Sequence, residues 1–333
     1  SNPSLWRYLP LLPISELIGQ DTPMGAVGGT STFAPRVLRA STGLPRLWVK
    51  DESRNPTGSF KDRASAVVVA RAHEIRAEVV VTASTGNAGA ALAGMSAAVG
   101  QRSVIFAPKT APPAKIAQLL VFGAQVLLVD GSYDDAFDLT IQAANEFGWY
   151  CRNTGYNPFT LEGKKTAAFE IWEWWEHLVK QKAVTSHERL CIFVSVGDGN
   201  IISGIHKGLR DLHALGWLDV MPRIFGVQAV GSAAIANAFR DGAETIIPVQ
   251  AKTLADSISV DLPRDGVRAV RAARQTDGSY LLVTDEQILQ AIAALGKVGI
   301  FAEPAGSTAY AGIAQALSED LICPDDFLHE LGV

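Results

Sequence analysis

Short apolar runs alternate with amphipathic segments along most of this chain. The runs are rich in Val, Ile and Leu with few polar interruptions, which is typical of strands buried on both faces of a parallel sheet. A Gly- or Ser-rich turn follows most of them. We predict strands within 47–50, 79–82, 103–107, 126–130, 190–196, 223–229 and 280–283, and a short apolar pair at 300–301.

The intervening segments carry apolar residues at helical spacing. Helices are predicted over 60–75, 88–99, 114–122, 133–147, 200–214, 232–240 and 285–297, with a last helix that ends at 317. Strands that alternate with helices form parallel sheets through right-handed crossovers. The pattern therefore predicts an α/β protein with parallel-rich sheets flanked by helices.

Composition narrows the class of protein. The chain has 333 residues, of which 48% are hydrophobic and 19% charged. This is enough for about two domains with substantial cores, and it excludes dominant disorder. Lys and Arg number 29 against 34 Asp and Glu, a net charge of −5 without a basic stripe. We therefore expect no nucleic-acid partner.

The cysteines and the apolar runs indicate in which cellular compartment the protein is expected. Cys151, Cys191 and Cys323 are far apart and odd in number, which excludes a disulfide framework and a CxxC metal site. We predict no metal centre. The longest apolar stretch, 119–129, is interrupted by Gly123 and is too short to span a membrane. With no signal-peptide pattern at the start, we expect a cytoplasmic protein that does not bind membranes.

Four polar turns follow predicted strands, at 55–61, 84–87, 197–200 and 303–307. Ligands of parallel sheets bind beyond the carboxyl ends of the strands, so chemistry is expected in these turns. The turn Gly197-Asp198-Gly199-Asn200 can offer backbone N–H groups and a helix N-terminus to a phosphate, although a tight turn needs the same glycines. Ile202 excludes the dinucleotide fingerprint, and Ile205 after Gly204 excludes the P-loop.

Lys61 follows the turn Asn55–Phe60, and Ser59 is a good N-cap, so the lysine falls in the first turn of a helix. The helix dipole and partial burial there lower the pKa of an amine and make it nucleophilic. The alternative is an ordinary solvated lysine. A nucleophilic amine together with a phosphate cradle is what pyridoxal phosphate requires.

These residues resemble threonine synthase and its relatives among the pyridoxal-phosphate enzymes of the tryptophan-synthase-β fold. The resemblance covers nearly the whole chain. It is carried by Asn55-Pro56-Thr57-Gly58-Ser59-Phe60-Lys61-Asp62-Arg63, Ser84-Thr85-Gly86-Asn87, Asn157-Pro158-Phe159, Glu162-Gly163-Lys164-Lys165-Thr166 and Glu303-Pro304-Ala305-Gly306.

The resemblance implies roles for individual residues. Lys61 resembles the Schiff-base lysine and general base, and Asn87 the partner of the cofactor's 3-hydroxyl. It also implies a phosphate loop and a set of substrate contacts. The phosphate loop comprises Gly197, Asp198, Gly199, Asn200 and Ile201; the substrate contacts are Ser84, Thr85 and Gly86 for the α-carboxylate, with Asn157 and Lys164.

Three departures separate the chain from the threonine-synthase pattern. Thr160 stands where an Arg usually helps to hold the substrate phosphate; Lys164 brings a charge nearby but not a bidentate fork. Ala88 follows Asn87 where Thr or Ser is common. The C-terminal Thr-Gly-x-Gly-Leu-Lys strand has no counterpart in Phe327–Val333, so no partner for the pyridine nitrogen is identified.

The resemblance implies a large domain, 1–59 with 152–333, and a smaller inserted domain, 60–151, with the cofactor in the cleft between them. It implies a lyase that converts O-phosphohomoserine and water to threonine and phosphate. The alternatives are a serine/threonine dehydratase, a diaminopropionate ammonia-lyase, a phosphoserine-using synthase, or a non-catalytic binder of a phosphorylated metabolite. A homodimer is expected from the family.

Overall fold

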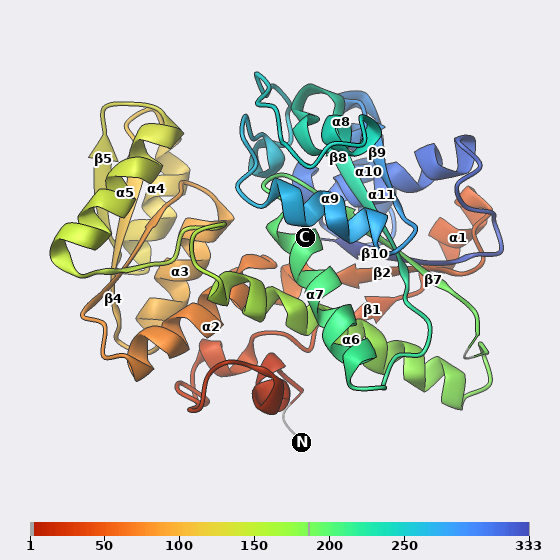
Figure 1. The fold of residues 1–333 in the computed structure, drawn as a ribbon, viewed down its shortest axis with the longest axis horizontal. Helices are drawn as coiled ribbons and strands as arrows, with labels where there is room; N and C mark the ends of the chain where they lie inside the picture. The colour runs from red at the N-terminus through yellow and green to blue at the C-terminus, as the bar shows by residue number, and fades with distance from the viewer. Residues whose placement is uncertain (1–2, 186, 333) are drawn as a thin grey trace. The chain divides into compact units, whose positions relative to one another are not determined.

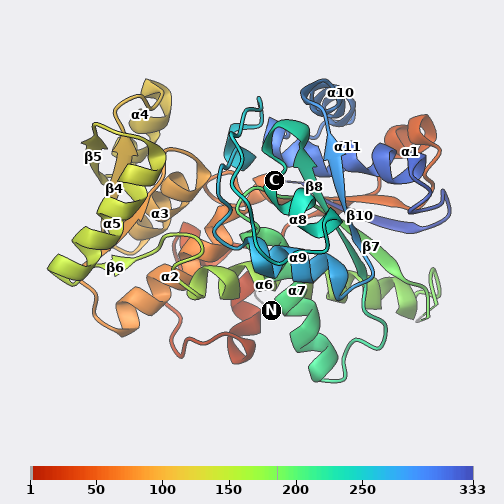
Figure 2. The same ribbon diagram turned by 45° about the horizontal axis from the view of Figure 1, so that its top comes forward.

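The computed structural model describes residues 3–185 and 187–332, shown from two sides in Figures 1 and 2. Its strands are β1 (Thr32–Phe33), β2 (Leu47–Asp51), β3 (Val79–Ala83), β4 (Arg102–Pro108), β5 (Gln125–Val129), β6 (Tyr150–Cys151), β7 (Leu190–Ser195), β8 (Arg223–Ala229), β9 (Ser279–Val283) and β10 (Phe327–Gly332). Its α-helices are α1 (Arg36–Thr42), α2 (Lys61–Glu74), α3 (Asn87–Ala98), α4 (Pro113–Val121), α5 (Tyr133–Phe147), α6 (Phe159–Lys180), α7 (Asn200–Ala214), α8 (Ala234–Arg240), α9 (Gly266–Arg274), α10 (Asp285–Gly296) and α11 (Pro304–Ser318).

The chain forms two compact units. Unit 1 comprises Ser1–Gly29 and Arg54–Thr166, and unit 2 comprises Thr30–Ser53 and Ala167–Val333. The predicted inserted domain, 60–151, falls within unit 1. Its proposed boundaries stay a prediction. The α/β class and the parallel sheets are confirmed.

Unit 1 is built on a four-stranded parallel sheet in the order β5-β4-β3-β6. Helix α5 covers one face, where Phe137 packs on Val79 and Val81. Helices α3 and α4 cover the other face, where Ala93 and Leu119 pack around Ile105. Figure 1 shows α5 and β4 together in this unit. The sheet thereby fixes the turn after β3, which includes Ser84.

Strand β5 corrects one prediction. Its apolar sequence indicated a strand buried on both faces, but β5 is the edge of the sheet and pairs only with β4 among the described residues. Leu128 is 52% exposed, and Val121 of the neighbouring α4 is 85% exposed. An apolar run alone does not distinguish a central strand from an edge strand.

Unit 2 is built on a six-stranded sheet in the order β1-β2-β10-β7-β8-β9. Only β1 runs antiparallel to its neighbour within this sheet of the described chain. One face packs on α1, α10 and α11 through residues such as Leu38, Ile288 and Ala309. In Figure 1 these helices, coloured orange for α1 and blue for α10 and α11, gather around this sheet. The sheet carries the glycine turn that follows β7.

The C-terminal residues also correct the sequence analysis. Residues 327–332 form β10, which lies in the middle of the sheet and pairs in parallel with β2 and β7. The apolar pair at 300–301 forms no strand, and Phe301 is 85% exposed. His329 and Glu330 broke the apolar pattern of β10 although both are fully buried.

Candidate active site

Lys61 lies in the first turn of α2, as predicted, but the N-cap is Phe60 and not the predicted Ser59. The Lys61 N–H donates to Ser59 Oγ at 3.3 Å. The preceding turn is held by Asp62, which is fully buried. Its carboxylate accepts from the Thr57 N–H at 2.7 Å and from the Thr57 hydroxyl. Gly58 has φ +81°, a left-handed value that favours glycine. These bonds fix the turn that presents Lys61, whose side chain is partly exposed.

Helix α2 is held against the first turns of α6 by a close backbone approach. A Cβ on Gly163 would lie 2.0 Å from the carbonyl oxygen of Arg63. The buried Arg63 donates to Thr166 Oγ1 at 3.1 Å. Gly163 is therefore required at this contact, and α2 has a rigid support beneath Lys61.

The turn Ser84–Asn87 joins β3 to α3 in the same unit as Lys61. Gly86 is the N-cap of α3, and its N–H donates to Ser84 Oγ at 3.3 Å. A Cβ on Gly86 would meet nothing within 4 Å, so the turn borders open space. The N–H groups of the first helical residues, beginning at Asn87, have no earlier helical carbonyl and suit an anion such as a carboxylate.

Asn157, Thr160 and Lys164 surround the start of α6. The Asn157 amide donates to the Cys151 carbonyl at 2.8 Å and accepts from the Phe159 N–H at 2.9 Å. Thr160 is fully buried and donates to the Asn157 carbonyl at 2.8 Å. Lys164 is 2% exposed. Asn157 and Thr160 thus shape the helix start, while Lys164 brings a buried cation to it.

The glycine turn in unit 2 joins β7 to α7. Gly199 is the N-cap of α7 with φ +85°, and a Cβ there would lie 2.7 Å from Ala269 Cβ. A Cβ on Gly197 would lie 2.8 Å from Ile258 Cα. Both glycines are needed, because the backbone of the turn passes close to neighbouring segments.

Asp198 is fixed by the segment that leads into α9. Its carbonyl accepts from the Asp265 N–H at 2.9 Å, and its carboxylate accepts from the Arg264 N–H at 3.2 Å. The Asn200 amide donates to Asp265. The N–H groups at the start of α7, including that of Ile201, then point out of a rigid turn. A helix of 15 residues behind such a turn suits a phosphate.

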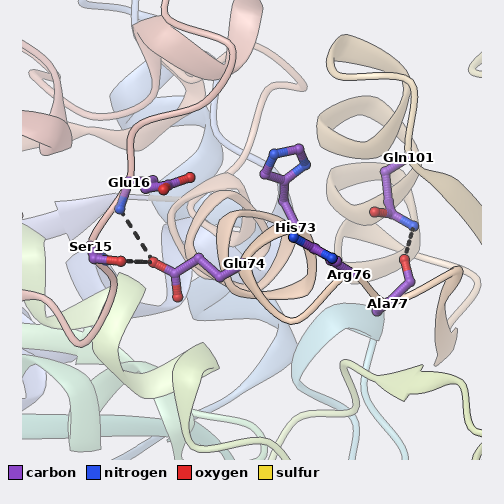
Figure 3. Close-up of a pocket in the computed structure, with 7 residues that line it drawn as sticks. All are labelled: Ser15, Glu16, His73, Glu74, Arg76, Ala77 and Gln101. Carbon is purple, nitrogen blue, oxygen red and sulfur yellow. Dashed lines mark hydrogen bonds between the residues drawn. The ribbon is translucent and has the colours of Figure 1, made fainter.

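A cavity of about 540 Å³ opens elsewhere in unit 1 (Figure 3). Its lining comes from the segment before α1, the end of α2 and the residues that precede β3 and β4: Ser15, Glu16, His73, Glu74, Arg76, Ala77 and Gln101. These positions lie at the amino ends of β3 and β4, whereas Ser84–Asn87 follows the carboxyl end of β3. The predicted site residues do not line this cavity.

The structure adds residues that the sequence analysis did not single out. Asp62 and Asp265 hold the two turns described above. Arg152, 1% exposed, lies beside the end of β3. Asp62 could have been found from the sequence, because it is an acidic residue directly after Lys61. Asp265 gave none, because it reaches the glycine turn from 65 residues further along the chain.

The family model of the pyridoxal-phosphate dependent enzymes matches residues 24–326. The chain belongs to this family. Its cofactor is pyridoxal 5'-phosphate, and the chain is a lyase. Threonine synthase of Methanocaldococcus jannaschii is 38% identical over 328 residues, which cover 97% of this chain and 77% of that protein. Threonine synthase of Methanosarcina acetivorans is 36% identical over 327 residues, 97% of this chain and 77% of the relative.

Solved structures support the fold. A processed threonine deaminase isoform from Solanum lycopersicum has a TM-score of 0.76 at 21% identity and covers 98% of this chain and 84% of its own. Diaminopropionate ammonia lyase from Escherichia coli has a TM-score of 0.74 at 20% identity and covers 91% of this chain and 84% of its own. None of the helices in the described residues has the length and apolar character needed to cross a membrane.

Proposed function

We propose that this family member is a threonine synthase that converts O-phosphohomoserine and water to threonine and inorganic phosphate. The observation that carries the proposal is the 38% identity to a threonine synthase over 97% of the chain. The local geometry supports it. Lys61 starts a helix behind a fixed turn, and a rigid glycine turn in unit 2 suits a phosphate.

The family resemblance assigns the residues that would hold the cofactor and the substrate. Lys61 would hold the cofactor aldehyde through its amine, and Asn87 would contact the 3-hydroxyl. The N–H groups from Gly197 to Ile201 would bind the cofactor phosphate, while Ser84, Thr85 and Gly86 would bind the substrate carboxylate. When bound, the cofactor supplies an electron sink for carbanions at the substrate.

Lys61 would carry out the proton transfers. Its Nζ would take the proton from the substrate α-carbon and then the proton from the β-carbon, and it would return protons to the γ-carbon, after the phosphate has left, and to the α-carbon. Water adds at the β-carbon after the γ-phosphate leaves. The Asp62–Thr57 bonds keep the start of α2 in place during these transfers. Buried cations such as Lys164 favour binding of the anionic side chain of the substrate.

A related lyase is the second candidate, favoured by one observation. The Thr160 hydroxyl donates to the Asn157 carbonyl, and the Thr160 side chain has no charge with which to bind a substrate phosphate. A serine/threonine dehydratase, a diaminopropionate ammonia-lyase or a phosphoserine-using synthase needs different side-chain contacts. The fold likeness to threonine deaminase and diaminopropionate ammonia lyase is compatible with each.

A substrate panel tests the proposal. The purified holoprotein is incubated with O-phosphohomoserine, O-phosphoserine, serine, threonine or diaminopropionate, and phosphate, ammonia, threonine and keto acids are measured. Threonine and phosphate in equal amounts are expected from O-phosphohomoserine. Keto acids from serine or threonine, without threonine synthesis, contradict the proposal and support a dehydratase. The Lys61→Ala protein is the inactive control.

The proposal extends to assembly and compartment. We expect a homodimer from the family likeness, which sedimentation equilibrium at micromolar concentration checks, and a monomer would contradict it. We also expect a cytoplasmic protein. The thiols of Cys151 and Cys191 are unbridged and buried, and burial raises their pKa values to about 11 and about 12, respectively. Such thiols need no oxidising compartment.

A further inference from the structure

Arg152 lies directly beside the carboxyl end of β3, the strand that leads to the Ser84–Asn87 turn. Its N–H donates to the Val81 carbonyl at 2.8 Å. The next residue, Asn153, accepts from Thr82 Oγ1 at 3.0 Å and from the Ala83 N–H at 2.8 Å. Arg152 and the carboxylate turn are therefore fixed to the same end of one strand.

The guanidinium of Arg152 also reaches α2. Its Nε donates to Ser65 Oγ at 3.4 Å, and its Nη1 donates to Thr154 Oγ1 at 3.0 Å. Ser65 lies four residues after Lys61 in α2, so the two share a face of the helix about 6 Å apart. Arg152 thus contacts α2 one helical turn beyond Lys61.

The position of Arg152 suits an anion on the substrate side chain. It is 1% exposed, and its bonds to Ser65 and Thr154 fix the plane of the guanidinium. A planar fork binds phosphate in a bidentate manner, which an ammonium cannot do. Lys164, 2% exposed, is another buried cation of unit 1.

This inference rests on the proposed function. We propose that Arg152 selects substrates with a phosphorylated side chain, a role that the uncharged Thr160 cannot fill. The substrate α-carboxylate binds at Ser84–Gly86 and its phosphate binds Arg152. These two anion sites, both next to the carboxyl end of β3, limit the enzyme to amino acids that carry a phosphate on a short side chain. Arg152 is a substrate-contacting residue under this assignment.

The test compares Arg152→Gln and Arg152→Lys with Arg102→Gln, which removes an exposed arginine of the same unit. Steady-state phosphate release from O-phosphohomoserine gives kcat and KM. Losing charge-assisted bonds to phosphate lowers kcat/KM about 100-fold or more in Arg152→Gln, mainly through KM. Arg152→Lys recovers part of the loss, and Arg102→Gln matches the wild type.

Two binding readouts separate selection from a structural role. Titrations followed by the visible cofactor absorption compare O-phospho-L-serine with L-serine, which differ only in the phosphate. Arg152→Gln is expected to abolish the preference for O-phospho-L-serine and leave L-serine binding unchanged. Inhibition by inorganic phosphate weakens in parallel. The resting absorption spectrum stays that of the wild type.

Other outcomes overturn the inference. Equal weakening of both serine ligands assigns Arg152 a structural role. An unchanged phosphate preference in Arg152→Gln places the phosphate elsewhere. A wild type that prefers O-phospho-L-serine but does not turn over O-phosphohomoserine contradicts the proposed reaction alone, and Arg152→Gln still decides the phosphate site. A wild type with no preference for phosphorylated ligands contradicts Arg152 selection itself.

Discussion

Glu330 carries the sharpest prediction about stability. It lies in β10, the central strand of unit 2, opposite Val49 of β2 and Phe193 of β7. It is fully buried, and neither carboxyl oxygen has a hydrogen-bond partner among the described residues. Burial, and then the nearby Asp51 carboxylate, raise the pKa of Glu330 well above its ordinary value of 4.5. The folded protein therefore keeps this acid protonated.

The difference in the pKa of Glu330 between the folded and the unfolded protein determines how the free energy of unfolding changes with pH. Above pH 4.5 the unfolded chain loses the Glu330 proton while the folded protein retains it. The unfolded state then binds fewer protons, so the free energy of unfolding falls as pH rises. The slope is about 1.4 kcal/mol per pH unit until the raised pKa is reached. The Gln side chain of Glu330→Gln does not titrate, so its free energy of unfolding lacks this pH dependence. The difference in free energy of unfolding between Glu330→Gln and the wild type therefore grows by about 3 kcal/mol from pH 6 to pH 8, provided the folded acid stays protonated.

Urea unfolding at a series of pH values measures this difference. Tryptophan fluorescence reports on unit 2, because Trp174 packs against His329 and Trp175 against Phe327. Glu319→Gln, which replaces an exposed glutamate at the end of α11, is the control and should give a small difference that does not vary with pH. A Glu330→Gln advantage that stays constant from pH 6 to pH 8, or that shrinks, refutes the reasoning.

Three further predictions use other residues. Burial, and then Lys50, lower the pKa of His329 from 6.5 to about 3. The unfolded state therefore gains a proton first as pH falls through 6.5, and His329→Leu should unfold at lower pH than the wild type in acid titrations followed by circular dichroism. Gly199→Ala should weaken pyridoxal phosphate binding at least tenfold in fluorescence titrations, whereas Gly216→Ala, also at positive φ but with no atom within 4 Å, should not. Asp62→Asn should lower the rate of phosphate release and the thermal midpoint, the latter by the equivalent of about 1–3 kcal/mol, because the half-buried Thr57 N–H loses its charged acceptor.

The elements that the sequence predicted best are those whose pattern depends on local physics. Helix α5 spans the predicted 133–147 and α7 the predicted 200–214, because each follows a clear turn and keeps helical spacing. The first helical turn at Lys61 was predicted correctly, although the N-cap was placed one residue early, at Ser59 instead of Phe60. Parallel sheets followed from the alternation of strands and helices.

The remaining features depend on contacts that are distant in the sequence. Strand β10 was missed because His329 and Glu330 interrupt its apolar pattern, and its central place comes from pairing with β2, which is far away in the chain. The apolar run of β5 gave no sign that it forms an edge. The proximity of Arg152 to Ser65 likewise depends on the arrangement of β6 beside β3, which spacing alone does not reveal.

The central claim is that Lys61 carries the cofactor. Purified holoprotein is reduced with borohydride and digested, and the lysine that bears the pyridoxyl phosphate is identified by mass spectrometry. The account predicts the label on Lys61, with loss of the visible absorption band on reduction and no band in Lys61→Ala. A label on Lys164 or Lys165, or a visible band that persists in Lys61→Ala, would contradict it.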